Sequence, residues 1–236
     1  MFWLLVAAGL GLMSLGHVAP FPFLLDSMAP APVLWNMPSD PDSPTVYLTF
    51  DDGPNPTATP QLLDVLANEE ASGTFFIIDR HLNEETAPIV RRMFDEGHAV
   101  ALHSHTRALM VMEPDELADT LTAAADRIER LAGGRPCPAF RPHGGSRSSQ
   151  MFKGLAQIDY ALVGWGWSLW DFNWYREPQP VGLADRLARR ISGGDIVVIH
   201  DGHHEDPRAD RQYAVDAVGL LIPQLRAEGF SFGTIC

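Results

Sequence analysis

Short apolar runs alternate with amphipathic stretches from residue 45 onward, and this alternation constrains the fold more than any other feature of the chain. We expect strands at Thr45–Phe50, Thr74–Ile78, Ala99–Leu102, Ala139–Arg141, Tyr160–Gly164, Asp195–His200 and Phe230–Ile235. We expect helices at Thr59–Asn68, Thr86–Glu96, Pro114–Leu131, Ser148–Gln157, Leu183–Ser192 and Ala209–Glu228. Strands that alternate with helices predict an α/β fold with a parallel sheet and crossover helices.

Composition narrows the class of protein. The length of 236 residues suits one α/β barrel domain, and 46% hydrophobic with 20% charged residues excludes a disordered, collagenous or coiled-coil chain. The net charge of -13 argues against a nucleic-acid partner and against binding to anionic lipid. Lys153 is the only lysine, and no glycine-rich phosphate loop accompanies it, which argues against a nucleotide-binding P-loop.

The first 16 residues are apolar and uncharged. This run is shorter than the roughly 20 apolar residues of a spanning helix, and it lacks the basic start of a signal peptide, since Arg80 is the first basic residue apart from His17. We interpret residues 1–25 as a signal-like or membrane-anchor segment, residues 26–44 as a proline-rich linker, and residues 45–236 as one domain. An extracytoplasmic protein, secreted or membrane-anchored, is therefore expected; the alternative is an N-terminal helix packed on the domain.

The chain has two cysteines, Cys137 and Cys236, and no CxxC motif. Two cysteines are too few for a disulfide scaffold. A disulfide would fit if the last strand ended near Cys137, but two unpaired thiols are the favoured interpretation.

Polar and titratable side chains follow the expected strands at their carboxyl ends. They are Asp51 and Asp52 after the first strand, His103 after the third, Arg141 at the end of the fourth, Asp171 and Asn173 after the fifth, and His200 at the end of the sixth. Ligand-binding and catalytic groups of α/β folds collect at the carboxyl ends of strands. The sequence therefore predicts an active site at this rim.

The residue types at the rim suit metal-assisted proton chemistry. Asp51 and Asp52 leave the strand in diverging directions, so one can bind a metal while the other handles a proton; the alternative is a helix N-cap. A neutral imidazole such as His103 ligates zinc, cobalt or nickel. Arg141, followed by Gly144, can orient a carboxylate beside backbone N–H groups that are free to bind an oxyanion.

Four tryptophans lie within ten residues, at Trp165, Trp167, Trp170 and Trp174. Aromatic faces at a rim suit sugar stacking, whereas packing in the core is the common alternative. His203 and His204 follow the last of the rim residues, and we expect both at the surface rather than in a metal site.

The motifs TFDDGP, HS, FRP-x-x-G, a tryptophan-rich segment and I-x-H occur in this order, and together they resemble the NodB-type polysaccharide deacetylases, carbohydrate esterase family 4. The resemblance covers about residues 45–236. It implies a distorted (β/α)7 barrel. It also implies a metal-dependent hydrolase that removes N- or O-acetyl groups from a polysaccharide or amino sugar.

The resemblance also implies a role for each matching residue. Asp51 would be the general base, Asp52 and His103 metal ligands, Arg141 the partner of Asp51, Gly144 an oxyanion donor, His200 the general acid and Trp174 a substrate contact. The implied cofactor is a divalent metal, zinc before cobalt or nickel. The implied partner is an acetylated glycan or amino sugar. The apolar N-terminus suggests a membrane tether in addition, and the net charge of -13 argues against nucleic acid.

Three positions depart from the family motifs. Arg107 stands where the family has a second histidine ligand, and a guanidinium cannot ligate a metal, so weak metal binding is expected unless His105 or His143 substitutes. Asn173 stands where an acid usually supports the general-acid histidine, although Asp171 could serve. His143 replaces a usual proline.

These departures keep two other functions open. The first is a catalytically weak or metal-free domain of the same fold that binds glycan. The second is a deformylase or amidase that acts on a lipid-linked amino sugar, which would suit the apolar N-terminus.

Overall fold

A computed structural model describes residues 6–9, 11, 16–169 and 179–236 of the chain, and its centre is a curled parallel sheet. The strands are β1 (Val33–Leu34), β2 (Thr45–Asp51), β3 (Thr74–Ile77), β4 (Ala99–His103), β5 (Ala139–Arg141), β6 (Ala161–Val163), β7 (Trp167–Ser168), β8 (Ile196–His200) and β9 (Ser231–Phe232). Their order is β1-β6-β5-β4-β3-β2-β8-β7, with β9 on β2, and every pairing is parallel. The α/β prediction is confirmed.

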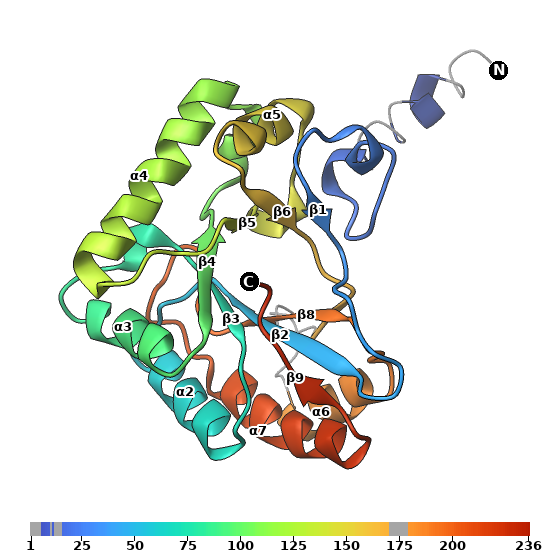
Figure 1. Ribbon diagram of the computed structural model, residues 1–236, viewed down its shortest axis with the longest axis vertical. Helices are drawn as coiled ribbons and strands as arrows, with labels where there is room; N and C mark the ends of the chain where they lie inside the picture. Colours follow the sequence, from blue (N-terminus) through green and yellow to red (C-terminus); the bar gives the residue numbers. More distant parts are fainter. Residues whose placement is uncertain (1–5, 10, 12–15, 170–178) are drawn as a thin grey trace.

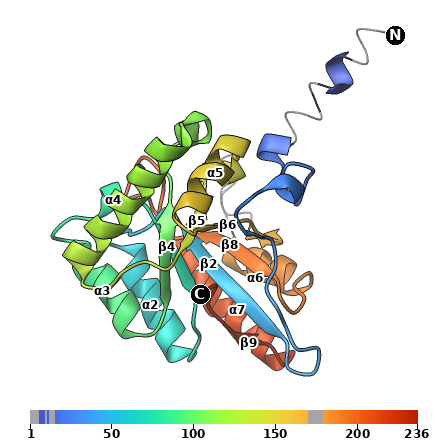
Figure 2. The same cartoon turned by 45° about the horizontal axis from the view of Figure 1, so that its top comes forward.

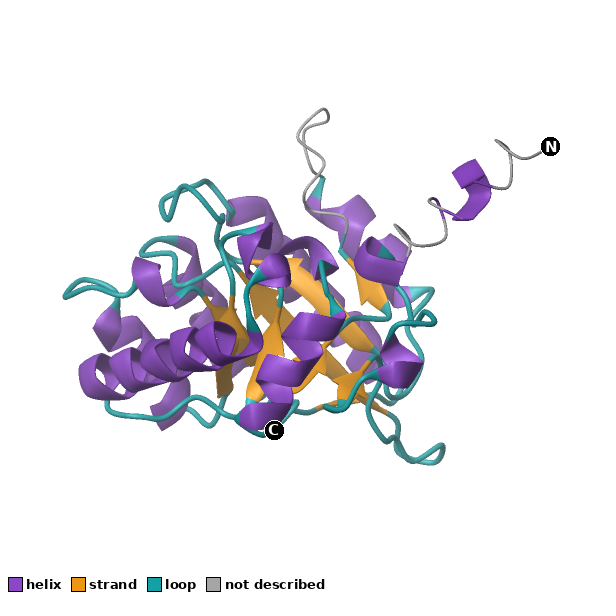
Figure 3. Cartoon of the chain, turned by 90° about the horizontal axis from the view of Figure 1, so that it is seen from above, coloured by secondary structure: helices purple, strands orange, loops and turns teal. Residues whose placement is uncertain are grey.

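Helices surround the strands (Figures 1 and 3). They are α2 (Ala58–Asn68), α3 (Ala87–Asp95), α4 (Pro114–Ala132), α5 (Ser149–Gln157), α6 (Pro180–Ala188) and α7 (Gln212–Ala227). All six expected helices are present, with ends displaced by a few residues. Four short 3₁₀ turns connect the elements: η1 (Asp26–Met28), η2 (Asp79–His81), η3 (Arg107–Val111) and η4 (His143–Gly145).

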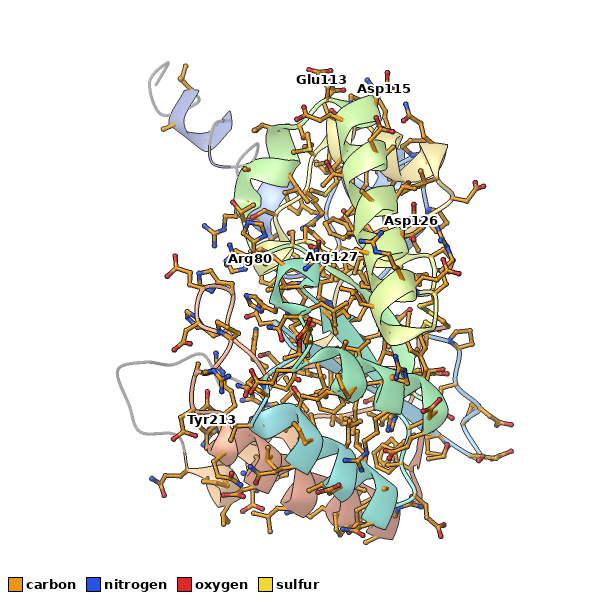
Figure 4. The ribbon with its side chains drawn as sticks, turned by 90° about the vertical axis from the view of Figure 1, so that its left-hand side faces the viewer. Arg80, Glu113, Asp115, Asp126, Arg127 and Tyr213 are labelled. Atoms are coloured by element: carbon orange, nitrogen blue, oxygen red, sulfur yellow. A yellow bond between two sulfur atoms is a disulfide. The ribbon has the colours of Figure 1, made fainter. Side chains whose placement is uncertain are left out.

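Local chemistry fixes the ends of several helices. Helix α5 begins after Ser148, whose side-chain oxygen accepts a hydrogen bond from Met151 N at 3.1 Å. Helix α4 ends at Gly133, which adopts a φ of 84° that favours glycine. Arg127 of α4 donates to the carbonyl oxygens of Asp79 and Leu82, at 3.2 and 2.8 Å, and so ties α4 to η2, where Arg80 lies in Figure 4.

Successive residues of each strand point to opposite sides of the sheet, and each side has its own apolar core. The larger core lies between the sheet and the helices and contains Phe75 of β3. The smaller core contains the next residue, Phe76, together with Val163 and Ile235. The C-terminal residues therefore fill the interior of the curled sheet, where Figure 1 shows the end of the chain.

The stretch predicted to be an extended linker, residues 26–44, is instead packed on the domain. Val33 and Leu34 form β1, which pairs with Leu162 and Val163 of β6. The prolines of this stretch prevent helix formation, but extended residues between them can still add a strand to a sheet edge. Within the part of the chain that the structure describes, no helix is long and apolar enough to cross a membrane.

Cys137 and Cys236 form a disulfide, with their Cα atoms 6.3 Å apart. The favoured interpretation of two unpaired thiols was therefore wrong. The C-terminal tail passes through the interior of the sheet: Ile235 N donates to Thr74 Oγ1 at 2.9 Å, and this contact brings the last residue to the start of β5. The spacing of 99 residues gave no local signal of the pairing.

Candidate active site

Strand register brings the expected rim residues together. Asp51 at the end of β2 stands opposite His200 at the end of β8. His103 at the end of β4 stands opposite Arg141 at the end of β5. Because all four strands run in parallel, these side chains emerge at one edge of the sheet.

Arg141 is fully buried and holds Asp51 from inside the sheet. Its Nη1 atom donates to Asp51 Oδ1 and to Thr49 Oγ1, both at 2.7 Å. Its Nε and Nη2 atoms donate to the carbonyl oxygens of Val163 and Gly164, at 3.3 and 3.0 Å. A charge-assisted hydrogen bond of this kind fixes a carboxylate in one orientation. Arg141 can therefore act as the sequence predicts, by keeping one oxygen of Asp51 paired and leaving the other for chemistry.

Asp52 points away from Asp51 because its backbone turns sharply. Its φ of 70° lies in the left-handed region, and the chain reverses at Gly53 directly after it. The loop after β8 lies directly against this turn. A Cβ atom added to Gly202 would be only 2.1 Å from the carbonyl oxygen of Asp52, so the two backbones are in contact. The turn directs the Asp52 carboxylate toward β4, where Oδ1 lies 3.2 Å from His103 Nε2.

A third group, His143, completes a cluster with Asp52 and His103. One ligand atom from each residue lies within 4.8 Å of the other two. The His143 backbone is fixed because its N–H donates to Ser104 Oγ at 2.9 Å. Three protein ligands around open positions are the usual arrangement of a catalytic zinc site.

The chemical state of these side chains fits a divalent cation. His103 Nδ1 is buried and has no hydrogen-bond partner among the described residues, and Asp52 Oδ1 is buried and faces His103 Nε2 at 3.2 Å. Burial alone would raise the pKa of Asp52, but contact with His103 and the charges of His200 and His143 hold it well below its usual value. Burial, together with the neighbouring His103, lowers the pKa of His143 to about 4. At neutral pH the set therefore offers a carboxylate and a neutral imidazole, which are ligating forms.

Arg107 lies beside this cluster without joining it. It is the first residue of η3, it is exposed, and its Nη2 would be 3.0 Å from a Cβ placed on Gly144. His105 also lies outside the group of three ligand atoms found among the described residues. The third ligand, His143, thus comes from the loop after β5 instead of the loop after β4.

The loop after β5 presents backbone N–H groups next to the cluster. Gly144 and Gly145 have φ values of 60° and 67°, which other residues adopt only with strain. A Cβ at Gly145 would meet the Trp165 ring at 2.9 Å, so the ring lies directly against this turn. Among the N–H groups of this turn, those of Gly145 and Ser146 donate to the carbonyl oxygens of Pro142 and His143, at 2.9 and 3.3 Å. The oxyanion role predicted for this turn therefore uses the N–H of Gly144.

Asp201 is a rim residue that the sequence analysis did not select. It is 1% exposed, it accepts a hydrogen bond from Thr59 Oγ1, and its Oδ1 has no partner. Burial raises the pKa of Asp201 to about 7, and the charges of Asp52 and Asp51 act in the same direction. The sequence signal that could have identified Asp201 as a rim residue is its position directly after His200, at the end of a buried strand.

Two other expectations have different outcomes. His204, predicted as a surface residue, keeps 31% of its side chain exposed, but its ring stacks on His143 with centroids 4.5 Å apart. Trp174, Asp171 and Asn173 lie outside the described residues, so their roles stay predictions.

Comparison with known proteins places the chain in a family. The family profile described as polysaccharide deacetylase matches residues 39–163. A peptidoglycan-N-acetylglucosamine deacetylase of Bacillus cereus is 29% identical over 203 residues, which cover 86% of this chain and 91% of the relative. A chitooligosaccharide deacetylase of Sinorhizobium fredii is 33% identical over 198 residues, which cover 80% of this chain and 88% of the relative.

Solved structures agree with the sequence comparison. A family 4 acetyl xylan esterase from Clostridium thermocellum, solved with a cobalt ion, superimposes with a TM-score of 0.71. The two proteins are 29% identical, and the match covers 81% of this chain and 88% of the esterase. The curled parallel sheet described above is therefore the distorted (β/α)7 fold of these enzymes, and the chain belongs to the polysaccharide deacetylase family.

Proposed function

We propose that the protein is a zinc-dependent hydrolase that removes N-acetyl groups from an amino-sugar glycan. One observation carries the proposal. A carboxylate held by a buried arginine, Asp51, stands directly beside three groups suited to one divalent cation, Asp52, His103 and His143. The B. cereus and S. fredii relatives act on peptidoglycan and chitooligosaccharide, as their names state, and they support a glycan of N-acetylated sugars as the substrate.

Asp52, His103 and His143 would hold the metal, and zinc suits one carboxylate with two imidazoles. When bound, the ion supplies a Lewis acid that polarises the acetyl carbonyl and lowers the pKa of a water molecule. The buried Asp52 Oδ1 atom, which faces His103 Nε2 at 3.2 Å, and the buried His103 Nδ1 atom support this assignment.

The remaining residues of the rim would move protons and hold charge. Asp51 would take the proton of the attacking water, with its other oxygen fixed by Arg141. The backbone N–H of Gly144 would donate to the oxyanion of the tetrahedral intermediate. His200, opposite Asp51 in the sheet register, would give a proton to the departing amine.

We also propose that the protein works outside the cytoplasm, tethered by its N-terminus. The Cys137–Cys236 disulfide supports an oxidising compartment. The apolar N-terminal run supports a tether, and the residues after it expose further apolar side chains, among them Val18, Phe21, Leu24 and Met28. The missing basic residues favour contact with hydrocarbon over attraction to anionic headgroups.

The test is acetate release and zinc content measured on one purified sample. Substrates are chitooligosaccharides, peptidoglycan fragments, acetylated xylan and a lipid-linked N-acetyl or N-formyl amino sugar. We expect acetate from N-acetylated glycans, loss of this activity after chelation, and recovery with added zinc. Zinc-loaded protein that binds these glycans and releases no acetate would favour the glycan-binding alternative, and hydrolysis confined to the lipid-linked sugar would favour the amidase alternative.

A further inference from the structure

Residues 16–28, here called the strap, lie before β1 and outside the matched family region of residues 39–163. The strap is docked on the domain next to β1 and α5, as two views agree (Figures 1 and 2). Ala19 is 1% exposed, and the carbonyl oxygen of His17 accepts a hydrogen bond from Arg147 N at 2.9 Å. The strap is thus part of the packed structure.

One buried guanidinium, that of Arg147, holds the strap. Arg147 is 0% exposed, and it donates to both carboxylate oxygens of Asp26, at 2.6 and 2.8 Å. It also donates to the carbonyl oxygens of Ala19 and Phe21, at 2.7 and 3.1 Å. A fully buried cation requires such partners, and removal of the Asp26 carboxylate leaves its charge uncompensated within the described residues.

The same guanidinium reaches the active site. Its Nη1 atom donates to the carbonyl oxygen of Gly145 at 3.3 Å, within residues 143–147, which we call the catalytic loop. This loop carries the metal-site imidazole of His143 and the N–H of Gly144. The loop is also held by the bond of His143 N to Ser104 Oγ, by the bond of Gly145 N to the carbonyl oxygen of Pro142, and by the rings of Trp165 and His204. Glycines give a backbone wide freedom, so the loop depends on its surroundings to keep one geometry.

We propose that the strap is a positioning element of the active site, acting through the Asp26–Arg147 pair. The pair fixes the catalytic loop, and the loop in turn fixes His143 and the Gly144 N–H. This inference rests on the proposed function, because it gives those two groups their roles. A strap that served only as a tether would not need an ion pair to a fully buried arginine of the catalytic loop.

The test uses full-length protein in mild detergent and the variant Asp26→Asn. We expect zinc affinity to fall about tenfold, the scale of losses when groups behind metal ligands are removed. We expect kcat to fall about tenfold with KM within twofold, because Gly144 acts on the transition state. Amide hydrogen exchange at residues 143–147 should accelerate in the metal-free protein, a readout that does not depend on activity.

Two further variants serve as controls. Asp26→Glu keeps the charge and should recover most of the zinc affinity. The control variant Asp126→Asn removes one acid partner of Arg135. Asp126 lies on α4 (Figure 4), and the side chains of both residues are about half exposed. Zinc affinity, kcat and hydrogen exchange should therefore keep their wild-type values. If Asp26→Asn does not fold, the double variant Asp26→Asn with Arg147→Met removes both charges and should show the same losses.

The inference is overturned if amides of residues 16–28 exchange freely in the variant while zinc affinity and kcat keep their wild-type values. It is also overturned if the strap stays protected without the pair. A wild-type protein that released no acetate would instead count against the proposed function, and the zinc and exchange comparisons would still test the strap.

Discussion

The two sides of the β2 carboxyl end hold adjacent aspartates in opposite ways. On one side, Asp51 is bound by a buried arginine whose donors are paired with protein oxygens. On the other side, Asp52 faces the imidazoles of His103 and His143, and its Oδ1 lies 3.2 Å from His103 Nε2. The difference shows how one residue type acquires two functions: a cation supplied by the fold orients Asp51, whereas Asp52 is left open for a cation from outside.

The largest expected effect is the loss of the Asp51 carboxylate, and it tests whether Asp51 and Asp52 have separate functions. Asp51→Asn should lower kcat by about 10²–10⁴, the usual contribution of a general base, while zinc affinity stays near the wild-type value. Acetate release and zinc titration on the same variant check both halves. Full activity in Asp51→Asn would contradict the general-base role. Loss of zinc in this variant would mean that Asp51 also supports the metal site, so that the two aspartates would not have separate functions.

The next effect is a pH dependence of stability caused by Asp201. Unlike Asp51 and Asp52, this buried aspartate faces neither an arginine nor an imidazole among the described residues, and its pKa is raised from 3.8 to about 7. Between these values the unfolded chain has released the proton and the folded chain has kept it, so stability should fall as pH rises from about 4 to about 7, then level off. Asp201→Asn should remove this dependence, worth up to about 4 kcal/mol. Urea unfolding in chelator at a series of pH values measures it. Equal pH profiles for both proteins would contradict a raised pKa.

His143→Ala tests the imidazole side directly. Loss of one of three ligands should weaken zinc binding by about a hundredfold, the upper end of effects seen even for groups behind the ligands. His204→Ala is the matched control, because its ring stacks on His143 without belonging to the ligand group. Competition titration with a chromophoric chelator gives both affinities. Equal losses in the two variants would mean that His143 acts by packing.

The smallest effect is expected at Arg107. Arg107→His removes an exposed cation near the site and restores the histidine spacing of the family, so zinc should bind about tenfold tighter. Arg107→Gln separates charge from ligation and should give only part of the gain. His105→Ala should leave the affinity unchanged. A loss of affinity in His105→Ala would instead make His105 the third ligand.

The sequence contained the fold and half of the site for a physical reason. Side-chain periodicity along a strand or helix is a local property, and it marked the sheet, the helices and the strand ends that carry Asp51, His103 and His200. Parallel strands bring their carboxyl ends to one edge, so grouping these residues needed no further information. The family motifs added the roles of these residues: Asp51 as general base held by Arg141, Asp52 as metal ligand and Gly144 as oxyanion donor.

The remaining features depend on contacts between distant segments. Arg147 and Asp26 are 121 residues apart, and Cys137 and Cys236 are 99 apart, so no window of the sequence reveals either pair. His143 was one of two candidate substitute ligands, beside His105, and the sequence could not choose between them, because the place of His143 beside His103 follows from the path of the loop after β5. Strand β1 has two residues, too few for a periodic signal.

Strand β1 has a counterpart at the opposite edge of the sheet, and the pair has a consequence for solubility. The strand order ends at β1 on one side and β7 on the other, and each has two residues. Long unpaired edges recruit strands from other molecules, whereas very short edge strands offer few free N–H and C=O groups. Pro32, directly before β1, has no N–H to offer. The apolar sheet is thereby protected against edge-to-edge aggregation.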